Sequence, residues 1–130
     1  MRVSEGMSKV VLTVAPGQSL LDAARLMTER NVGAAVVIDP DAPGPGILTE
    51  RDVIRALAKD ACAGAESVGD HATERATYAS PDWSLERAAD EMVKGGFRHL
   101  IVVDGSTVAG VLSMRDIVTC WVGDGASCEI

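Results

Sequence analysis

Two segments of this chain, residues 3–60 and 68–121, are copies of one pattern. When the sequence is aligned with itself at an offset of 65 positions, many residues are identical in the two copies. After Asp39 the offset becomes 64, because the loop of the first copy has one more residue. The identical pairs are Val3 with Val68, Pro16 with Pro81, Ser19 with Ser84, Leu20 with Leu85, Ala23 with Ala88, Ala24 with Ala89, Met27 with Met92 and Asp39 with Asp104. Duplicated halves usually pack face to face, because neither can bury its apolar face alone. The sequence therefore predicts two half-domains about a pseudo-two-fold axis, with function in the cleft between them.

Each copy predicts the order strand, helix, strand, strand, helix, which is an α/β (α+β) fold. Apolar residues recur at helical spacing after Ser19 and again in the second copy, and continuous apolar runs indicate buried strands. In the first copy the elements are a strand at 10–14, a helix from 19, strands at 34–38 and 47–48, and a helix from 49. In the second copy they are a strand at 77–80, a helix through 85–93, strands at 100–103 and 108–112 around a tight turn, and a helix from 113.

Length and composition indicate one soluble unit. The chain has 130 residues, 47% of them hydrophobic, and a mean hydropathy of +0.15. No apolar run approaches the ~18 residues that a membrane span requires, and residues 1–7 lack the apolar core of a signal peptide. We therefore expect a cytoplasmic protein that hides further apolar surface by self-association.

Charge and cysteine content exclude several classes of site and partner. The cysteines Cys62, Cys120 and Cys128 form no pair at metal-ligand or redox-motif spacing, so neither a zinc site nor a disulfide framework is indicated. A formal charge of −7 opposes attraction to nucleic acid or to anionic membranes. Four aromatic residues offer no stacking platform for single-stranded bases.

The most specific motif is a Thr or Ser followed three residues later by Asp. It stands where a predicted strand ends and a helix begins. Thr49 and Ser113 occupy this position in the two copies. Each hydroxyl can cap its helix while the N-terminal amides remain able to receive an anion. Arg51 and Arg115, two residues further on, can add donors that fit phosphate oxygens, or they can point to solvent.

Asp52 and Asp116 complete this motif and admit two interpretations. A carboxylate can accept hydrogen bonds in two directions, as the 2′,3′-diol of a ribose requires. The same spacing is also that of a capping box, in which the acid reaches back to the amide of the capping residue. Both interpretations remain open from the sequence.

The pattern as a whole resembles the cystathionine-β-synthase (CBS) domain, present as the tandem pair called a Bateman module. The resemblance rests on the proline before the first helix, the apolar strand ending in Asp39 or Asp104, and the Gly-apolar-apolar stretch before Thr49 or Ser113. It implies one CBS domain at 3–60, a connector at 61–67, a second at 68–121 and a tail at 122–130. It further implies a stand-alone module that binds AMP, ADP, ATP, S-adenosylmethionine or a related adenosine ligand in the clefts between the copies.

The resemblance also implies roles for individual residues. It assigns ribose binding to Asp52 and Asp116 and phosphate contact to Thr49 and Ser113. Arg98 and His99 stand where the first copy has glycine and alanine, and they look like phosphate ligands, which would make one site more cationic. The alternatives are an ion-paired surface arginine and a packed histidine.

An adenine slot is implied at the first strand of each copy, at residues 11–14 and 76–79. Thr13, Val14, Tyr78 and Ala79 are the candidates, although each apolar one can equally be a core residue. The resemblance also implies that the segment before each of these strands lines the adenine slot. In that segment the first copy has Met7, and the second copy has no methionine at the equivalent position.

Self-association and signalling complete the expectations. Trp121 ends the last helix, and such helices pack modules of this family into dimers, so we expect a homodimer with Trp121 near the interface. No nucleophile, base or metal set indicates catalysis, and we expect no enzyme activity and no required cofactor. The predicted function is an adenosine-binding regulator that signals to an effector protein not identified by the sequence. The alternative is a structural interaction module that binds nothing small.

Overall fold

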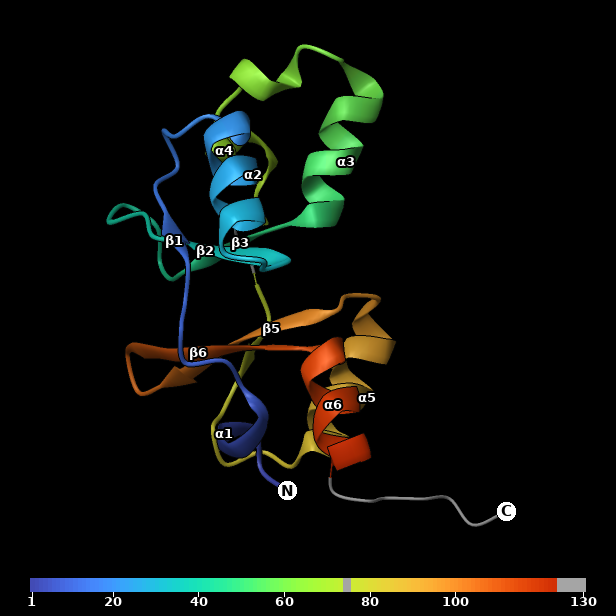
Figure 1. Ribbon diagram of the computed structural model, residues 1–130. Helices are drawn as coiled ribbons and strands as arrows, with labels where there is room; N and C mark the ends of the chain where they lie inside the picture. Colours follow the sequence, from blue (N-terminus) through green and yellow to red (C-terminus); the bar gives the residue numbers. More distant parts are fainter. Residues whose placement is uncertain (74–75, 124–130) are drawn as a thin grey trace. The chain divides into compact units, whose positions relative to one another are not determined.

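The computed structural model describes residues 1–73 and 76–123 and forms two compact units (Figure 1). The first-repeat unit spans Val11–Ala76, and the second-repeat unit combines Met1–Val10 with the chain from Thr77 onward. Most of the predicted tail, from residue 124, and Cys128 lie outside the described residues.

In the first-repeat unit, a three-stranded sheet has the order β1-β2-β3, with β2 parallel to β1 and antiparallel to β3. Its elements are β1 (Thr13–Val14), α2 (Leu20–Glu29), β2 (Ala34–Val37), β3 (Gly46–Thr49), α3 (Glu50–Lys59), the 3₁₀ turn η1 (Ala63–Ala65) and α4 (Val68–His71). The predicted element order is confirmed, but β1 covers only Thr13–Val14 of the strand predicted at 10–14, and η1 and α4 were not predicted.

The second-repeat unit repeats this topology with the order β4-β5-β6. Its elements are α1 (Val3–Gly6), β4 (Tyr78–Ala79), α5 (Leu85–Gly95), β5 (His99–Asp104), β6 (Thr107–Ser113) and α6 (Met114–Gly123). The predicted tight turn at 104–106 joins β5 to β6, and Gly105 supplies its positive φ of 62°. The short helix α1 was not predicted.

Local sequence signals define the long helices. The Ser19 hydroxyl accepts a hydrogen bond from the Asp22 amide at 3.1 Å, and the Ser84 hydroxyl accepts one from the Arg87 amide at 3.1 Å. These caps satisfy amides that have no partner within the helix. Gly96 ends α5 in the left-handed conformation, with φ 71°.

Helices cover one face of each sheet. In the first-repeat unit, alternate strand residues pack with α2, α3, η1 and α4, and Leu48 and Ala35 are fully buried. In the second-repeat unit, Leu100, Val102 and Leu112 are fully buried in the equivalent core with α5. Strand alternation therefore leaves the intervening residues on the opposite face.

Each repeat completes its core with the short helix that begins the other repeat in the sequence. The Val3 amide donates to the Trp83 carbonyl at 2.8 Å, and at the equivalent place the Val68 amide donates to the Gln18 carbonyl at 2.8 Å. Val3 and Val68 are both fully buried, in the second-repeat and first-repeat cores respectively. The two repeats have therefore exchanged their first helices.

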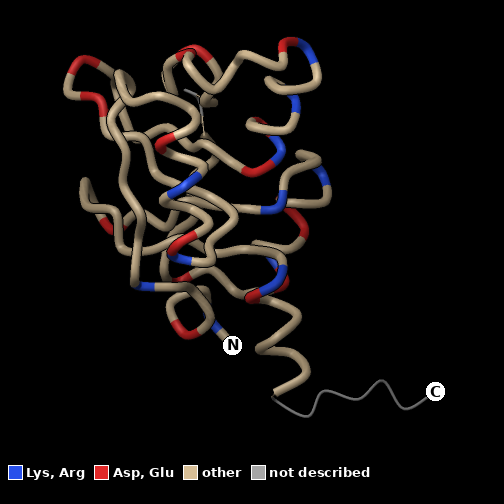
Figure 2. The backbone as a smooth tube through the Cα atoms, turned by 45° about the horizontal axis from the view of Figure 1, so that its top comes forward, with Lys and Arg blue, Asp and Glu red and all other residues tan. Residues whose placement is uncertain are grey.

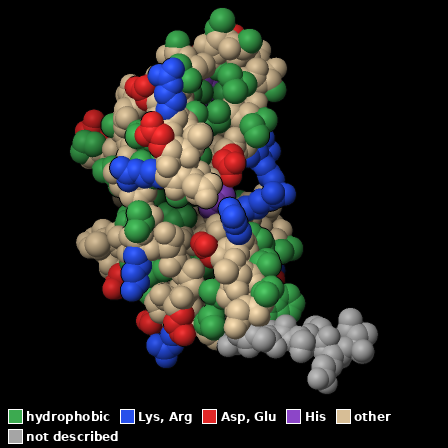
Figure 3. Space-filling view, in the orientation of Figure 1, with side chains coloured by type: hydrophobic (Ala, Val, Ile, Leu, Met, Phe, Trp, Pro, Cys, Tyr) green, Lys and Arg blue, Asp and Glu red, His purple; other side chains and the backbone are tan. Residues whose placement is uncertain are grey.

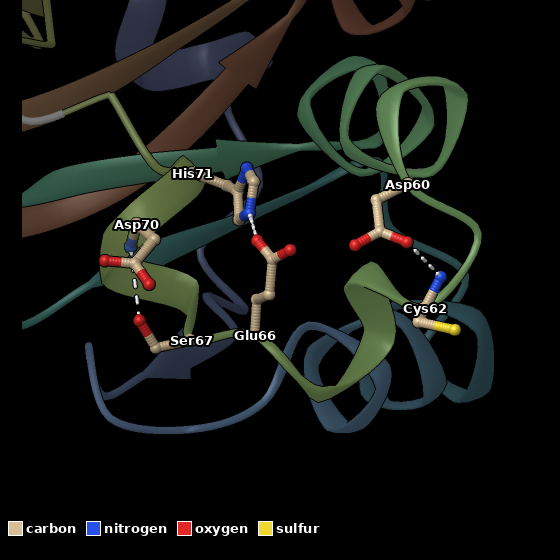
Figure 4. A network of polar contacts seen from close by, with 6 residues as sticks. All are labelled: Asp60, Cys62, Glu66, Ser67, Asp70 and His71. Carbon is tan, nitrogen blue, oxygen red and sulfur yellow. Dashed lines mark hydrogen bonds and ion pairs between the residues drawn. The ribbon is translucent and has the colours of Figure 1, made fainter.

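Local side-chain contacts order the segment between α3 and α4 (Figure 4). The Asp60 carboxylate accepts from the Cys62 amide at 2.9 Å, and Nε2 of the His71 ring lies 2.5 Å from Oε2 of Glu66. Ala63, within η1, is 1% exposed and belongs to the core. The segment predicted as a connector thus contributes to the first-repeat unit.

No described helix has the length and apolar character needed to cross a membrane.

Candidate functional site

The junction of β3 and α3 holds Thr49 and Asp52 in a reciprocal pair. Thr49 ends the strand and caps the helix, and its hydroxyl accepts from the Asp52 amide at 3.3 Å. The Asp52 carboxylate accepts in return, through Oδ2, from the Thr49 amide at 2.9 Å and from the Thr49 hydroxyl at 3.0 Å. Both side chains are half-buried, and Arg51 is exposed.

The junction of β6 and α6 repeats the arrangement with Ser113 and Asp116. The Asp116 amide donates to the Ser113 hydroxyl at 3.0 Å, and Asp116 Oδ2 accepts from the Ser113 amide at 2.9 Å. These two side chains are also half-buried, and Arg115 is exposed. Both capping boxes that the spacing allowed are therefore formed.

The capping box uses one oxygen of each carboxylate. All the hydrogen bonds that the Asp52 and Asp116 carboxylates accept from the described residues end on Oδ2. Their Oδ1 atoms accept none within residues 1–73 and 76–123. Each carboxylate is consequently held in place at the start of its helix through Oδ2.

Strand register places several predicted site residues on one sheet face. In the second-repeat unit, His99 pairs with Ser113, and Tyr78 pairs with Ile101, two residues along the strand from His99. Because paired residues and residues two apart share a face, Tyr78, His99 and Ser113 lie on the face opposite the helices.

The first-repeat unit has the same arrangement with different side chains. Thr13 pairs with Val36, and Ala34 pairs with Thr49, so Thr13 and Thr49 share the face opposite the helices. Val14 and Ala79 instead point into the cores, with 3% and 2% exposed. Only Thr13 and Tyr78 of the four predicted adenine-slot residues have exposed side chains.

The two junctions differ in charge. The Glu50 amide donates to the Gly33 carbonyl at 3.0 Å, and the equivalent Met114 amide donates to the Arg98 carbonyl at 2.8 Å. The second-repeat junction therefore has a cationic arginine where the first has glycine, and a neutral methionine where the first has Glu50. Arg98 is exposed and His99, beside it, is half-buried. Across both units, acidic and basic residues are otherwise interspersed (Figure 2).

Because the short helices are exchanged, each sheet is bordered by residues that belong to the other repeat in the sequence. Ser8 forms an antiparallel bridge with Val111 of β6, and Thr73 forms the equivalent bridge with Ile47 of β3. Met7 and Ser8 therefore border the Ser113 sheet and not the Thr49 sheet. Equivalent positions in the two copies were visible in the sequence, but only long-range contacts determine which sheet each one joins.

Apolar side chains are exposed at equivalent positions of α3 and α6, and we call each set an apolar triplet (Figure 3). On α3 the triplet is Ile54, Leu57 and Ala58, with Ile54 65% exposed. On α6 it is Val118, Trp121 and Val122, with Trp121 55% exposed. Because water-exposed apolar clusters mark contact surfaces, the triplets are candidate association faces.

The described residues contain no group of three or more His, Cys, Asp or Glu side chains that could hold a metal ion.

Comparison with known proteins identifies the repeat. The CBS domain family model matches residues 3–59 and 68–123. The CBS domain-containing protein YhcV of Bacillus subtilis (strain 168) is 30% identical over 115 residues, which are 88% of this chain and 81% of that protein.

Solved structures share the fold over the whole chain. A protein with CBS domains from Burkholderia ambifaria MC40-6 superposes with a TM-score of 0.88 at 28% identity, covering 100% of both chains. The CBS domain pair of protein MJ0100, in complex with methylthioadenosine and S-adenosyl-L-methionine, superposes with a TM-score of 0.85 at 24% identity, covering 95% of this chain and 98% of that one. With its two matched repeats and this fold, the chain belongs to the CBS domain family.

Proposed function

We propose that this chain is a regulatory module without catalytic activity, which binds an adenosine-type ligand at its strand-helix junctions and signals to a partner protein. The observation that carries the proposal is the pair of preorganised carboxylates, Asp52 and Asp116. Each is fixed by its capping box through Oδ2, with Oδ1 free of hydrogen bonds in the described chain. A ribose hydroxyl is a suitable donor for such an oxygen, and the hydroxyl-capped helix start beside it favours an anion.

The ligand classes proposed are AMP, ADP, ATP and S-adenosylmethionine. The methylthioadenosine and S-adenosyl-L-methionine bound to the MJ0100 domain pair support an adenosine moiety as the common feature. Charge separates the two junctions: Arg98 favours phosphorylated ligands at the second-repeat junction, and Glu50 disfavours phosphate at the first, whereas Arg115 and Arg51 are equivalent. The predicted ligand cleft between the repeats stays a prediction.

The ligand proposal predicts a thermal shift that depends on the junction carboxylates. At a ligand concentration 100 times Kd, binding stabilises the fold by about 2.7 kcal/mol, or roughly 10 °C in Tm for a chain of this size. Asp116→Ala is expected to remove the shift caused by AMP, ADP or ATP, because the ribose loses its acceptor at the cationic junction. Differential scanning fluorimetry with these nucleotides, adenosine and S-adenosylmethionine measures both effects.

Each variant is compared with its own ligand-free form, because loss of the capping box alone costs about 1 kcal/mol. Asp52→Ala tests the first-repeat junction in the same way. Asp22→Ala is the matched control, since Asp22 is exposed at the third position of α2 and its carboxylate is outside both junctions. No shift with any ligand, or equal shifts in wild type and both junction variants, contradicts the proposal.

A second candidate function is an interaction module that assembles through its helices and binds no small ligand. The apolar triplets favour it, and they also support the proposed homodimer, because both repeats expose apolar side chains at the same helical positions. The thermal assay distinguishes the two functions. An interaction module is expected to show no increase in Tm with any ligand and still to form a dimer.

The homodimer predicts a strong effect of a charge in the α6 triplet. Trp121→Asp is expected to weaken dimerisation about 30-fold or more, because large aromatic residues dominate interface energies and a buried carboxylate is costly. Sedimentation velocity over a concentration series gives the dissociation constant. Val93→Asp is the control, because Val93 is 72% exposed on α5, outside both triplets. Equal effects of the two substitutions contradict an interface at α6.

A further inference from the structure

The exposed face of α3 combines apolar side chains with like charges. Ile54 is 65% exposed, and Arg55 and Lys59 are exposed beside it. On α5, Lys94 stands four residues after Asp90, and its ammonium lies 2.8 Å from that carboxylate. On α3, Lys59 stands four residues after another cation, Arg55, and residues at this spacing are neighbours on a helix surface. Two positive charges therefore lie next to each other on one side of α3, where they repel.

The apolar and basic side chains of α3 form two adjacent stripes. Each residue turns an α-helix by about 100°, so Ile54 and Ala58 share one stripe, and Arg55 and Lys59 share the next. Leu57, 48% exposed, borders the apolar stripe on its other side. The exposed face of α3 is thus apolar along its middle and positively charged along one border.

This combination is specific to α3. The residues of α6 equivalent to Arg55 and Lys59 are Thr119 and Gly123, which carry no charge. The chain as a whole has a formal charge of −7, which opposes binding to a nucleic acid or to an anionic membrane, because both present negative charge over a wide area. A short acidic segment of a protein meets only the positive border of α3 and is attracted to it.

We infer that α3 is the docking surface for the partner protein and that the partner presents an acidic, amphipathic helical segment. The inference rests on the partner in the proposed function, and it adds the place and the chemistry of the contact. Apolar side chains of the segment cover the α3 triplet, and its carboxylates lie opposite Arg55 and Lys59. An amphipathic helix is a common occupant of such an apolar face. The homodimer contact proposed at α6 belongs to the other unit and is not required.

Two synthetic peptides test the charge of the occupant. Both have about 18 residues, long enough to form a helix, with leucines at helical spacing and flanking glutamates in one peptide or lysines in the other. Fluorescence anisotropy gives their dissociation constants. We expect the acidic peptide to bind the wild-type chain at least about 10-fold more tightly than the basic one, and Arg55→Glu combined with Lys59→Glu to reverse this preference.

The matched control is Arg2→Glu combined with Lys94→Glu. It changes the net charge by the same amount through two exposed side chains of the second-repeat unit, and it should leave the preference for the acidic peptide in place. Ile54→Ser tests the apolar stripe and should weaken binding of the acidic peptide about 10-fold. Because Ile54 is 65% exposed, this substitution leaves the fold intact.

Several outcomes overturn the inference. The acidic peptide does not bind, it binds no better than the basic one, or the control variant loses as much affinity as the α3 variant. Dissociation of a homodimer by the acidic peptide in sedimentation velocity assigns α3 to a second copy of the chain. Tighter binding of wild type to phosphatidylserine vesicles than to the acidic peptide assigns α3 to a membrane surface. The thermal shift with nucleotides is measured separately, so each of these outcomes leaves the ligand proposal standing.

Discussion

Val3→Asp is expected to unfold the second-repeat unit, although Val3 begins the first repeat in the sequence. Val3 is fully buried in the second-repeat core, where its amide is bonded to the Trp83 carbonyl at 2.8 Å. A buried carboxylate without a partner costs on the order of 3–5 kcal/mol, which is comparable with the whole stability of a unit of this size. Hydrogen exchange measured by mass spectrometry should show lost protection in α5 and β5 before any loss in α2 and β2.

Two further substitutions make this test specific. Val68→Asp is the reciprocal variant, because Val68 is fully buried in the first-repeat core, and it should reverse the order in which protection is lost. Val10→Asp is the neutral control, since Val10 is 73% exposed. Earlier loss of protection in α2 than in α5 on Val3→Asp would show that the short helices are not exchanged.

Gly110→Ala is expected to lower the free energy of unfolding by about 1–3 kcal/mol, the usual cost of overpacking. A Cβ atom at Gly110 would lie 2.5 Å from the Ser8 carbonyl oxygen and 2.9 Å from the Met7 sulfur. The obstacle is backbone, which is held by reciprocal hydrogen bonds of 2.9 and 3.1 Å between Ser8 and Val111. The substitution therefore either strains β6 or detaches the N-terminal segment, and urea unfolding measures the loss.

The control for this variant is Gly17→Ala. No atom lies within 4 Å of the Cβ position at Gly17, so the change should alter the free energy of unfolding by less than about 0.5 kcal/mol. Stability of Gly110→Ala equal to that of Gly17→Ala would contradict the close approach of Ser8 to β6.

Local patterns were sufficient for the repeated topology and for the capping geometry. Helical spacing after Ser19 predicted α2, and the hydroxyl-to-Asp spacing at Thr49 and Ser113 correctly included the capping box. These features depend on residues within one or two turns of each other, so they can be recognised in a single sequence. The adenosine role of the same aspartates remains a prediction.

The sequence by itself determined the duplicated strand and helix order, the helix starts and the family. Only the tertiary structure decided that Val3 and Val68 complete the core of the opposite repeat, and that Val14 and Ala79 point into the cores while Tyr78 is exposed. The physical reason is that a four-residue helix is too short to be stable alone and exists through whichever apolar surface it covers. That surface lies far away in the sequence, where neither periodicity nor capping signals can indicate it.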